Sequence, residues 1–190
     1  MVGFVRIPSI SAGADTDSSA EIERAADYLI NKFTSLQFST EKLFVVPSKN
    51  PLVIARDPHF SPDKETILFY GHYDVQGVDN PRQAWTVDPF AGEKRDGYLI
   101  ARGASDNKGP TFAHIKGAES VLNSNTDLPF NILFVIEGEE ECGSGALEAY
   151  INEGGLNKFG PFLCTVISDT SMYGPDQPSL TIGLRGISYL

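Results

Sequence analysis

The sequence predicts an α/β fold, a layered catalytic domain with a largely parallel central sheet flanked by helices. Three short runs are rich in apolar residues without alternation, which is typical of strands buried on both faces, at residues 65–70, 131–137 and 162–168. Segments with helical periodicity separate these runs, and this alternation favours parallel strands. The 190 residues, 41% of them hydrophobic, suffice for one well-filled core.

The first helix is predicted to begin after Ser18. Ser18 and Glu21 have the spacing of a capping box. Six apolar residues then recur on one helical face: Ile22, Ala25, Ala26, Leu29, Phe33 and Leu36. Two short apolar runs follow, at 42–46 and 52–56, with prolines between them. This pattern indicates two strands joined by a turn.

The remaining elements continue the alternation of strands and helices. A short strand is predicted at 98–101. A helix follows that ends at about Leu122, and Pro110 suits its first turn, where the missing N–H matters least. Another helix over 144–151 separates the second apolar run from the third. The carboxyl ends of the buried strands should therefore meet at one edge of the sheet.

The charge and composition exclude several function classes. The net charge is -10, and the sequence contains no cluster of Lys and Arg that could neutralise phosphates. We therefore expect no nucleic-acid partner. The apolar runs are shorter than the roughly 20 residues that span a bilayer, and the first residues lack the regions of a signal peptide. We therefore expect no membrane association and a cytoplasmic location. The acidity fits either a soluble surface or a carboxylate-rich cation site.

The two cysteines, Cys142 and Cys164, are too few for a disulfide framework, and neither belongs to a CxxC pair. Reduced thiols are therefore expected. Cys142 lies inside an acidic motif and could bind zinc, but a small buried side chain is the interpretation that we prefer.

Acidic residues and one histidine gather just beyond the predicted strand ends. They come from four segments: His72 with Asp74, Asp106, the acidic run 137–141, and Asp169. Ligands of open α/β sheets bind outside the carboxyl ends of the strands, so we expect these side chains to converge. A bound cation is the simplest way to keep converging carboxylates ionised, and a histidine among them favours zinc over calcium.

Each motif also has a simpler interpretation. His72 could be an ordinary hydrogen-bonded histidine, or a ligand whose other ring nitrogen donates to Asp74. Asp106 could cap the following helix, or hold a metal that the neighbouring glycines allow to approach closely. The acidic run could be solvated, or it could pair a metal ligand with a general base that takes a proton from water.

Four motifs occur together in this order: GHYDV at 71–75, GASDNKG at 103–109, EGEEECGSG at 137–145 and ISDT at 167–170. This set resembles the zinc aminoacylase, carboxypeptidase and carnosinase-like dipeptidase family of co-catalytic metallopeptidases. The resemblance extends from about Ile7 to the end of the sequence. In motif form it looks most similar to the cytosolic dipeptidase and glutathione-degrading branch.

The resemblance implies two zinc ions, which manganese or cobalt could replace at such nitrogen and oxygen ligands. Asp106 would bridge the two ions. His72 and Asp169 would complete one site, and Glu141 would serve the other. The peptide bond between Asp106 and Asn107 would be cis, which is rare before a residue other than proline.

The resemblance also implies the catalytic groups of an amide hydrolase. Glu140 would be the general base that activates water, and Asp74 would orient His72. We place Glu140 as base and Glu141 as ligand by aligning on the flanking glycines. The implied substrate is a dipeptide or small peptide.

Members of this family are longer chains with an inserted lid or dimerisation domain. Residues 1–182 would then be the amino-terminal part of the catalytic domain, and 183–190 the first strand of that lid. A histidine from further along would complete the second site, since neither His59 nor His114 is a suitable substitute. The implied partner is a second copy or another subunit, in a homo-oligomer or hetero-complex formed through the lid. As an alternative, the chain is a non-catalytic or incomplete subunit that needs further sequence or a partner, and it would be inactive alone.

Overall fold

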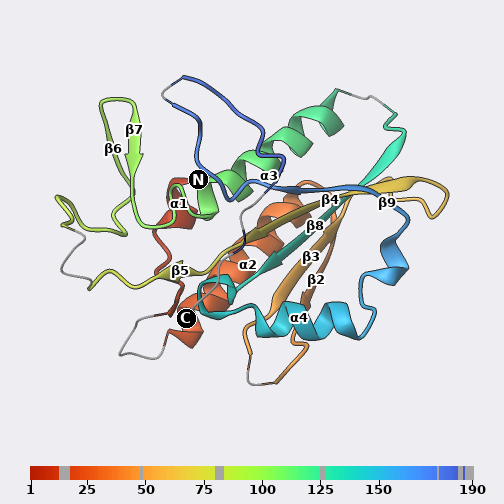
Figure 1. The fold of residues 1–190 in the computed structure, drawn as a ribbon, viewed down its shortest axis with the longest axis horizontal. Coiled ribbons are helices and arrows are strands. Elements are labelled where there is room, and N and C mark those ends of the chain that lie inside the picture. Colours follow the sequence, from red (N-terminus) through yellow and green to blue (C-terminus); the bar gives the residue numbers. More distant parts are fainter. Residues whose placement is uncertain are drawn as a thin grey trace.

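The computed structural model describes residues 1–12, 18–47, 49–79, 84–124, 127–174, 176–183 and 186. At its centre is a five-stranded sheet in the order β2-β3-β8-β4-β9 (Figure 1). The strands are β2 (Ser39–Leu43), β3 (Leu52–Arg56), β4 (Glu65–His72), β8 (Phe130–Glu137) and β9 (Phe162–Ile167). The predicted α/β class is confirmed, and the three apolar runs form the three adjacent strands β8, β4 and β9.

The sheet is mixed, with its parallel half on the side of the acidic motifs. β4 runs parallel to both β8 and β9, whereas β3 is antiparallel to β8 and to β2. The expectation of parallel strands therefore holds for the three strands that precede the motifs. Their carboxyl ends lie at one edge of the sheet, because His72 pairs with Glu137 and Tyr70 pairs with Ile167.

Helices cover both faces of the sheet. α2 (Ser19–Ser35) and α3 (Lys108–Asn123) pack on one face, and α4 (Gly145–Asn152) packs on the other (Figure 1). Alternate residues of β8 therefore enter different cores: Phe134 packs under α2 and α3, and Leu133 packs under α4. This two-sided burial explains the apolar run without alternation. Each fully buried Leu or Phe contributes about 1.5–3 kcal/mol through the removal of apolar surface from water.

Short elements surround the carboxyl edge of the sheet. They are α1 (Val2–Val5), β1 (Ile10–Ala12), β5 (Val75–Gln76), β6 (Glu93–Arg95), β7 (Tyr98–Ile100) and the 3₁₀ turn η1 (Glu140–Cys142). A second 3₁₀ turn, η2 (Asn157–Phe159), lies at the opposite edge, where the hydroxyl of Thr66 at the start of β4 donates to the backbone oxygen of Phe159. β1 pairs in parallel with β5, and β6 and β7 form an antiparallel hairpin. The amino-terminal segment therefore lies beside the chain that follows His72.

Several strands differ from the sequence-based expectation: β1 and β5 were not predicted, and β2 and β6 depart from it as follows. β2 lies three residues before the predicted position 42–46, because its last residue pairs with Leu52, the first residue of β3. β6 is charged and carries no apolar pattern, so periodicity does not indicate it. The signal for this hairpin is the Asp96-Gly97 pair, whose φ angles of 52° and 83° suit a two-residue hairpin turn.

β9 is more exposed than its apolar sequence predicts. Leu163 is 53% exposed and Ile167 is 55% exposed. β9 lies at the edge of the sheet, and β4 is its one partner strand within the described residues. Cys142 and Cys164 are exposed free thiols, which corrects the buried position predicted for Cys142. Cys142 lies in η1, a surface turn, instead of in the core.

Most of the strand predicted at 183–190 falls outside the described residues, so the division of the chain at residue 182 stays a prediction. Across the part of the chain that the structure describes, no helix combines the length and apolar character needed to cross a membrane.

Candidate metal centre

The predicted acidic cluster forms at the carboxyl edge of the parallel strands. His72 is the last residue of β4, and Asp169 follows β9 after one intervening residue. Glu140 opens the turn η1 shortly after β8, and Asp106 lies two residues before α3. The fold brings these four side chains together because the strands that precede three of them run in the same direction.

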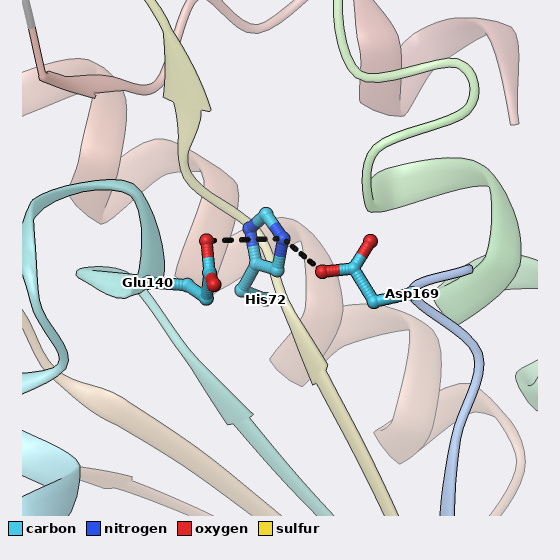
Figure 2. A group of neighbouring side chains, drawn as sticks. All are labelled: His72, Glu140 and Asp169. Atoms are coloured by element: carbon cyan, nitrogen blue, oxygen red, sulfur yellow. Dashed lines mark ion pairs between the residues drawn. The ribbon is translucent and has the colours of Figure 1, made fainter. Parts of the chain in front are cut away.

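The imidazole of His72 lies between two carboxylates, as Figure 2 shows. Its Nε2 atom is 3.4 Å from Oδ2 of Asp169 and 3.8 Å from Oε2 of Glu140. One potential ligand atom from each of these three residues lies within 4.8 Å of the others. Oδ1 of Asp106 approaches the same Nε2 atom to 3.1 Å. The arrangement offers one nitrogen and three carboxylates to a cation.

The two nitrogens of His72 have different environments. Nδ1 lies 3.2 Å from the backbone oxygen of Asp74 and 3.2 Å from its Oδ1. Both oxygens only accept hydrogen bonds when the carboxylate is ionised, so Nδ1 is the donor and carries a proton. Nε2 is buried and, within the described residues, has no partner with hydrogen-bond geometry, although carboxylates lie at ion-pair distance. A buried nitrogen of this kind fits a metal ligand.

Asp74 connects the imidazole to the acidic turn. It is fully buried, and it accepts a hydrogen bond from the Ser11 hydroxyl. The backbone N–H groups of Glu140 and Glu141 also donate to it, at 3.3 Å and 3.1 Å. These donors satisfy a buried carboxylate. Asp74 therefore fixes both the ring of His72 and the backbone of η1, a wider role than the predicted orientation of the histidine.

The electrostatics of the cluster favour a positive charge. Burial lowers the pKa of His72, but the hydrogen bond and charge of Asp74, with the charges of Glu140 and Asp169, outweigh burial and raise it to about 9. Burial is also the main reason why the pKa values of Glu140 and Glu141 are raised. The carboxylates thus stabilise a proton on His72, and a divalent cation at Nε2 would satisfy them more fully. The donor set fits zinc.

Glu141 is not a member of the three-residue cluster, although the charges of Asp106 and His72 act on its carboxyl group. Its Oε2 accepts a hydrogen bond from Nε2 of Gln76 at 2.8 Å. The three-residue cluster contains Glu140 in its place. The assignment of Glu140 as base and Glu141 as ligand stays a prediction. The peptide bond between Asp106 and Asn107 is cis, as expected.

Several residues that frame the site carry no clear signal in the sequence. Lys108 is fully buried, and its Nζ donates to the backbone oxygens of Ile7 at 2.6 Å and Phe4 at 3.3 Å. His114 contacts the hydroxyl of Ser168 through Nε2 at 2.6 Å and is not in the three-residue cluster. These contacts join segments distant in the sequence, so spacing alone cannot indicate them.

Comparisons with known proteins identify the family of this chain. The model of peptidase family M20/M25/M40 matches residues 68–183. Cys-Gly metallodipeptidase dug1 of Schizosaccharomyces pombe is 35% identical over 97% of this chain and 40% of the relative. The human Beta-Ala-His dipeptidase is 42% identical over 73% of this chain and 27% of the relative.

Solved structures show the same relationship. Human carnosine dipeptidase 1 superposes with a TM-score of 0.78 and 33% identity, over 88% of this chain and 37% of the other. An M20 family metallo-carboxypeptidase of Sulfolobus solfataricus gives a TM-score of 0.74 and 31% identity, over 90% of this chain and 36% of the other. The chain thus spans 40% or less of the length of these relatives. Because the family match covers more than half of its residues, the chain belongs to peptidase family M20/M25/M40.

Proposed function

We propose that the protein is a metal-dependent hydrolase that cleaves the amide bond of a dipeptide or small peptide. The observation that carries this proposal is the buried Nε2 of His72, which faces three carboxylates without a hydrogen-bond partner among the described residues. The names of the relatives, a metallodipeptidase and a dipeptidase, support the substrate class.

His72, Asp106 and Asp169 would hold one zinc ion, and Asp106 and Glu141 would contribute to a second. Manganese or cobalt could occupy the same ligands. Such an ion, when bound, supplies Lewis acidity and makes a water molecule more acidic. Asp74 keeps the proton on Nδ1 of His72, so Nε2 remains available to the ion. The second site would be incomplete with these residues alone.

Glu140 would be the general base. Its carboxylate borders Nε2 of His72, and its backbone is held by Asp74. Burial raises its pKa, which makes the ionised carboxylate a stronger proton acceptor. Glu140 would take a proton from the attacking water and transfer it to the leaving nitrogen of the amide.

An open depression beside the cluster offers room for a small substrate. It has a volume of about 790 Å³, and Asp106 and Asp169 form part of its wall. The rest of the wall contains small or apolar side chains, among them Ala104, Pro110 and Ala113. A peptide in this depression would lie directly beside the proposed metal ligands.

We propose the activity for the protein together with whatever segment or subunit completes the second site. Residues 1–182 would belong to its catalytic domain and 183–190 to the first strand of a lid, through which a homo-oligomer or hetero-complex would form. The alternative is an incomplete subunit that binds metal but does not turn over substrate by itself. This alternative is motivated by the chain spanning 40% or less of the length of these relatives. A cytoplasmic location stays a prediction.

The test combines zinc content with hydrolysis. Elemental analysis of the purified chain should find bound zinc, and a set of dipeptides should reveal zinc-dependent cleavage if the site is complete. Glu140→Gln should keep the zinc and lower turnover by about 10²–10⁴-fold. Glu148→Gln, an exposed acid on α4, is the matched control and should change neither.

The outcomes separate the hypotheses. Absence of zinc from the wild-type chain would refute the metal centre. Zinc without hydrolysis would favour the incomplete-subunit alternative. Full activity in Glu140→Gln would refute the role of Glu140 as base.

A further inference from the structure

Asn107 occupies a central position among the segments that carry the proposed ligands. It directly follows Asp106, precedes α3 and is 2% exposed. Two other ligand-bearing segments, the end of β4 with His72 and the chain at Ser168 before Asp169, border its amide. A buried amide needs partners for its oxygen and its nitrogen, so the groups around it determine its orientation.

The neighbouring groups fix this amide in one of its two orientations. Oδ1 of Asn107 accepts a hydrogen bond from the hydroxyl of Thr111 at 2.7 Å and lies 3.5 Å from the backbone nitrogen of His72. Nδ2 faces the backbone oxygen of Ser168 at 3.5 Å. A backbone N–H can only donate and a carbonyl can only accept, so reversing the amide would lose both contacts. The side chain of Asn107 thus bridges the segments of His72 and Ser168. Its backbone is bonded to Asp106, the third proposed ligand.

Gly71 provides an independent observation of how tightly this amide is packed. A Cβ atom at Gly71 would lie 2.2 Å from Oγ1 of Thr111 and 3.0 Å from Oδ1 of Asn107. The pair formed by Thr111 and Asn107 therefore contacts the backbone of β4 directly, one residue before His72. A glycine is required there because any side chain would push the pair away from the strand.

We propose that Asn107 is a positioning residue that sets the spacing of His72, Asp106 and Asp169 through its side-chain amide. This inference rests on the proposed metal centre. Metal affinity depends on ligand atoms being held within about 0.5 Å of the productive geometry. Asn107 supplies that restraint, because movement of either neighbouring segment would separate its buried amide from a partner.

The test measures zinc affinity by competition with a chelator of known affinity, alongside the melting temperature of the metal-free chain. Asn107→Leu keeps a similar volume and removes both polar atoms of the amide, and it should weaken zinc binding by about 10–100-fold. Asn107→Asp keeps an acceptor for Thr111 and His72 but loses the donor to Ser168, so it should lose less zinc affinity than Asn107→Leu. Asn123→Leu, at the exposed end of α3, is the matched control and should leave zinc affinity unchanged.

Thr111→Val covers the case in which Asn107→Leu does not fold. It preserves shape and removes only the hydroxyl that donates to Asn107, so zinc affinity should fall by about 3–10-fold, a fraction of the loss expected for Asn107→Leu. If the wild-type chain binds no zinc, the metal centre and this inference both fail. If the wild type binds zinc and the folded Leu or Val variant binds it equally, only this inference fails. A lower melting temperature with unchanged zinc affinity would mean a purely structural role and would also overturn it.

Discussion

Lys108→Met tests the energetic consequence of burying an amine behind the metal centre. Lys108 is fully buried, and its Nζ donates to the backbone oxygens of Ile7 and Phe4. The same atom lies 5.1 Å from the centroid of the Phe4 ring. Methionine retains the apolar stem but leaves two buried carbonyls without this donor. Each carbonyl keeps a backbone donor, because the N–H of Ile7 donates to Phe4 and the N–H of Ser9 donates to Ile7, so each lost hydrogen bond costs about 0.5–1.5 kcal/mol.

The magnitude of the pH effect follows from the pKa of Lys108. Burial lowers this pKa from 10.5 to about 7, with a smaller contribution from the charge of Arg24, while Asp74 and Glu21 oppose the shift. Between these two values the unfolded chain binds a proton that the folded chain lacks. The stability that Lys108 contributes must therefore rise with pH, by about 1.4 kcal/mol per pH unit. From pH 7.5 to 9.5 the gain is roughly 3 kcal/mol.

The assay is urea unfolding at pH 7.5, 8.5 and 9.5 in the presence of a chelator, so that metal binding does not contribute. The difference in the free energy of unfolding between wild type and Lys108→Met should grow by roughly 3 kcal/mol across this range. Taking the difference at each pH cancels other titrating groups, His72 among them. Lys116→Met, a half-exposed lysine on the same helix, is the control and should give a constant difference. A constant difference for Lys108→Met would show that the buried amine stays charged, and would refute the reasoning.

Two further predictions concern the packing around Tyr73 and the release of a proton on zinc binding. Gly138→Ala would place a Cβ atom 2.4 Å from Oη of Tyr73, a fully buried ring, and should lower the free energy of unfolding by about 1–3 kcal/mol. Gly117→Ala lies in α3, where an added Cβ atom would meet no described atom within 4 Å beyond the backbone of its own helix, and it should instead raise the free energy of unfolding by about 0.5–1 kcal/mol. Equal urea midpoints for the two variants would contradict this packing. Zinc binding at pH 7 should release about one proton, because the pKa of His72 is raised to about 9 without metal. Calorimetry in buffers of different ionisation enthalpy measures that proton, and a zero value would exclude His72 as a ligand.

The sequence predicted the parts of the site that depend on strand direction. His72 and Asp169 each follow an apolar run without alternation, and such runs are typical of parallel strands buried on both faces. Parallel strands place their carboxyl ends together, so the residues that follow them are expected to converge on the basis of the sequence alone. Asp106 was predicted from a different signal, its place between glycines at a strand-to-helix junction, because the preceding strand β7 belongs to a separate antiparallel hairpin.

The rest of the site depends on contacts that local patterns do not encode. Ser11 donates to Asp74 from 63 residues away, and no spacing rule relates the two. Lysine is seldom fully buried, so the sequence favours an exposed Lys108. The choice between Glu140 and Glu141 depends on how a single 3₁₀ turn directs two adjacent carboxylates, and neighbouring identical residues give no periodic signal. Exposure of β9 likewise depends on what borders it, which its own apolar residues cannot indicate.

The amino-terminal segment shows how these long-range contacts act together. The Ser9 hydroxyl donates to the backbone oxygen of Tyr73 at 2.6 Å, and the N–H of Val75 donates to the oxygen of Ser9 at 2.9 Å. The same segment binds Asp74 through Ser11 and holds the start of α3 through Lys108. It therefore restrains the histidine ligand on one side and the segment of Asp106 on the other. Because ligand positions determine metal affinity, this segment would belong to the proposed metal centre although it contains none of the proposed ligands.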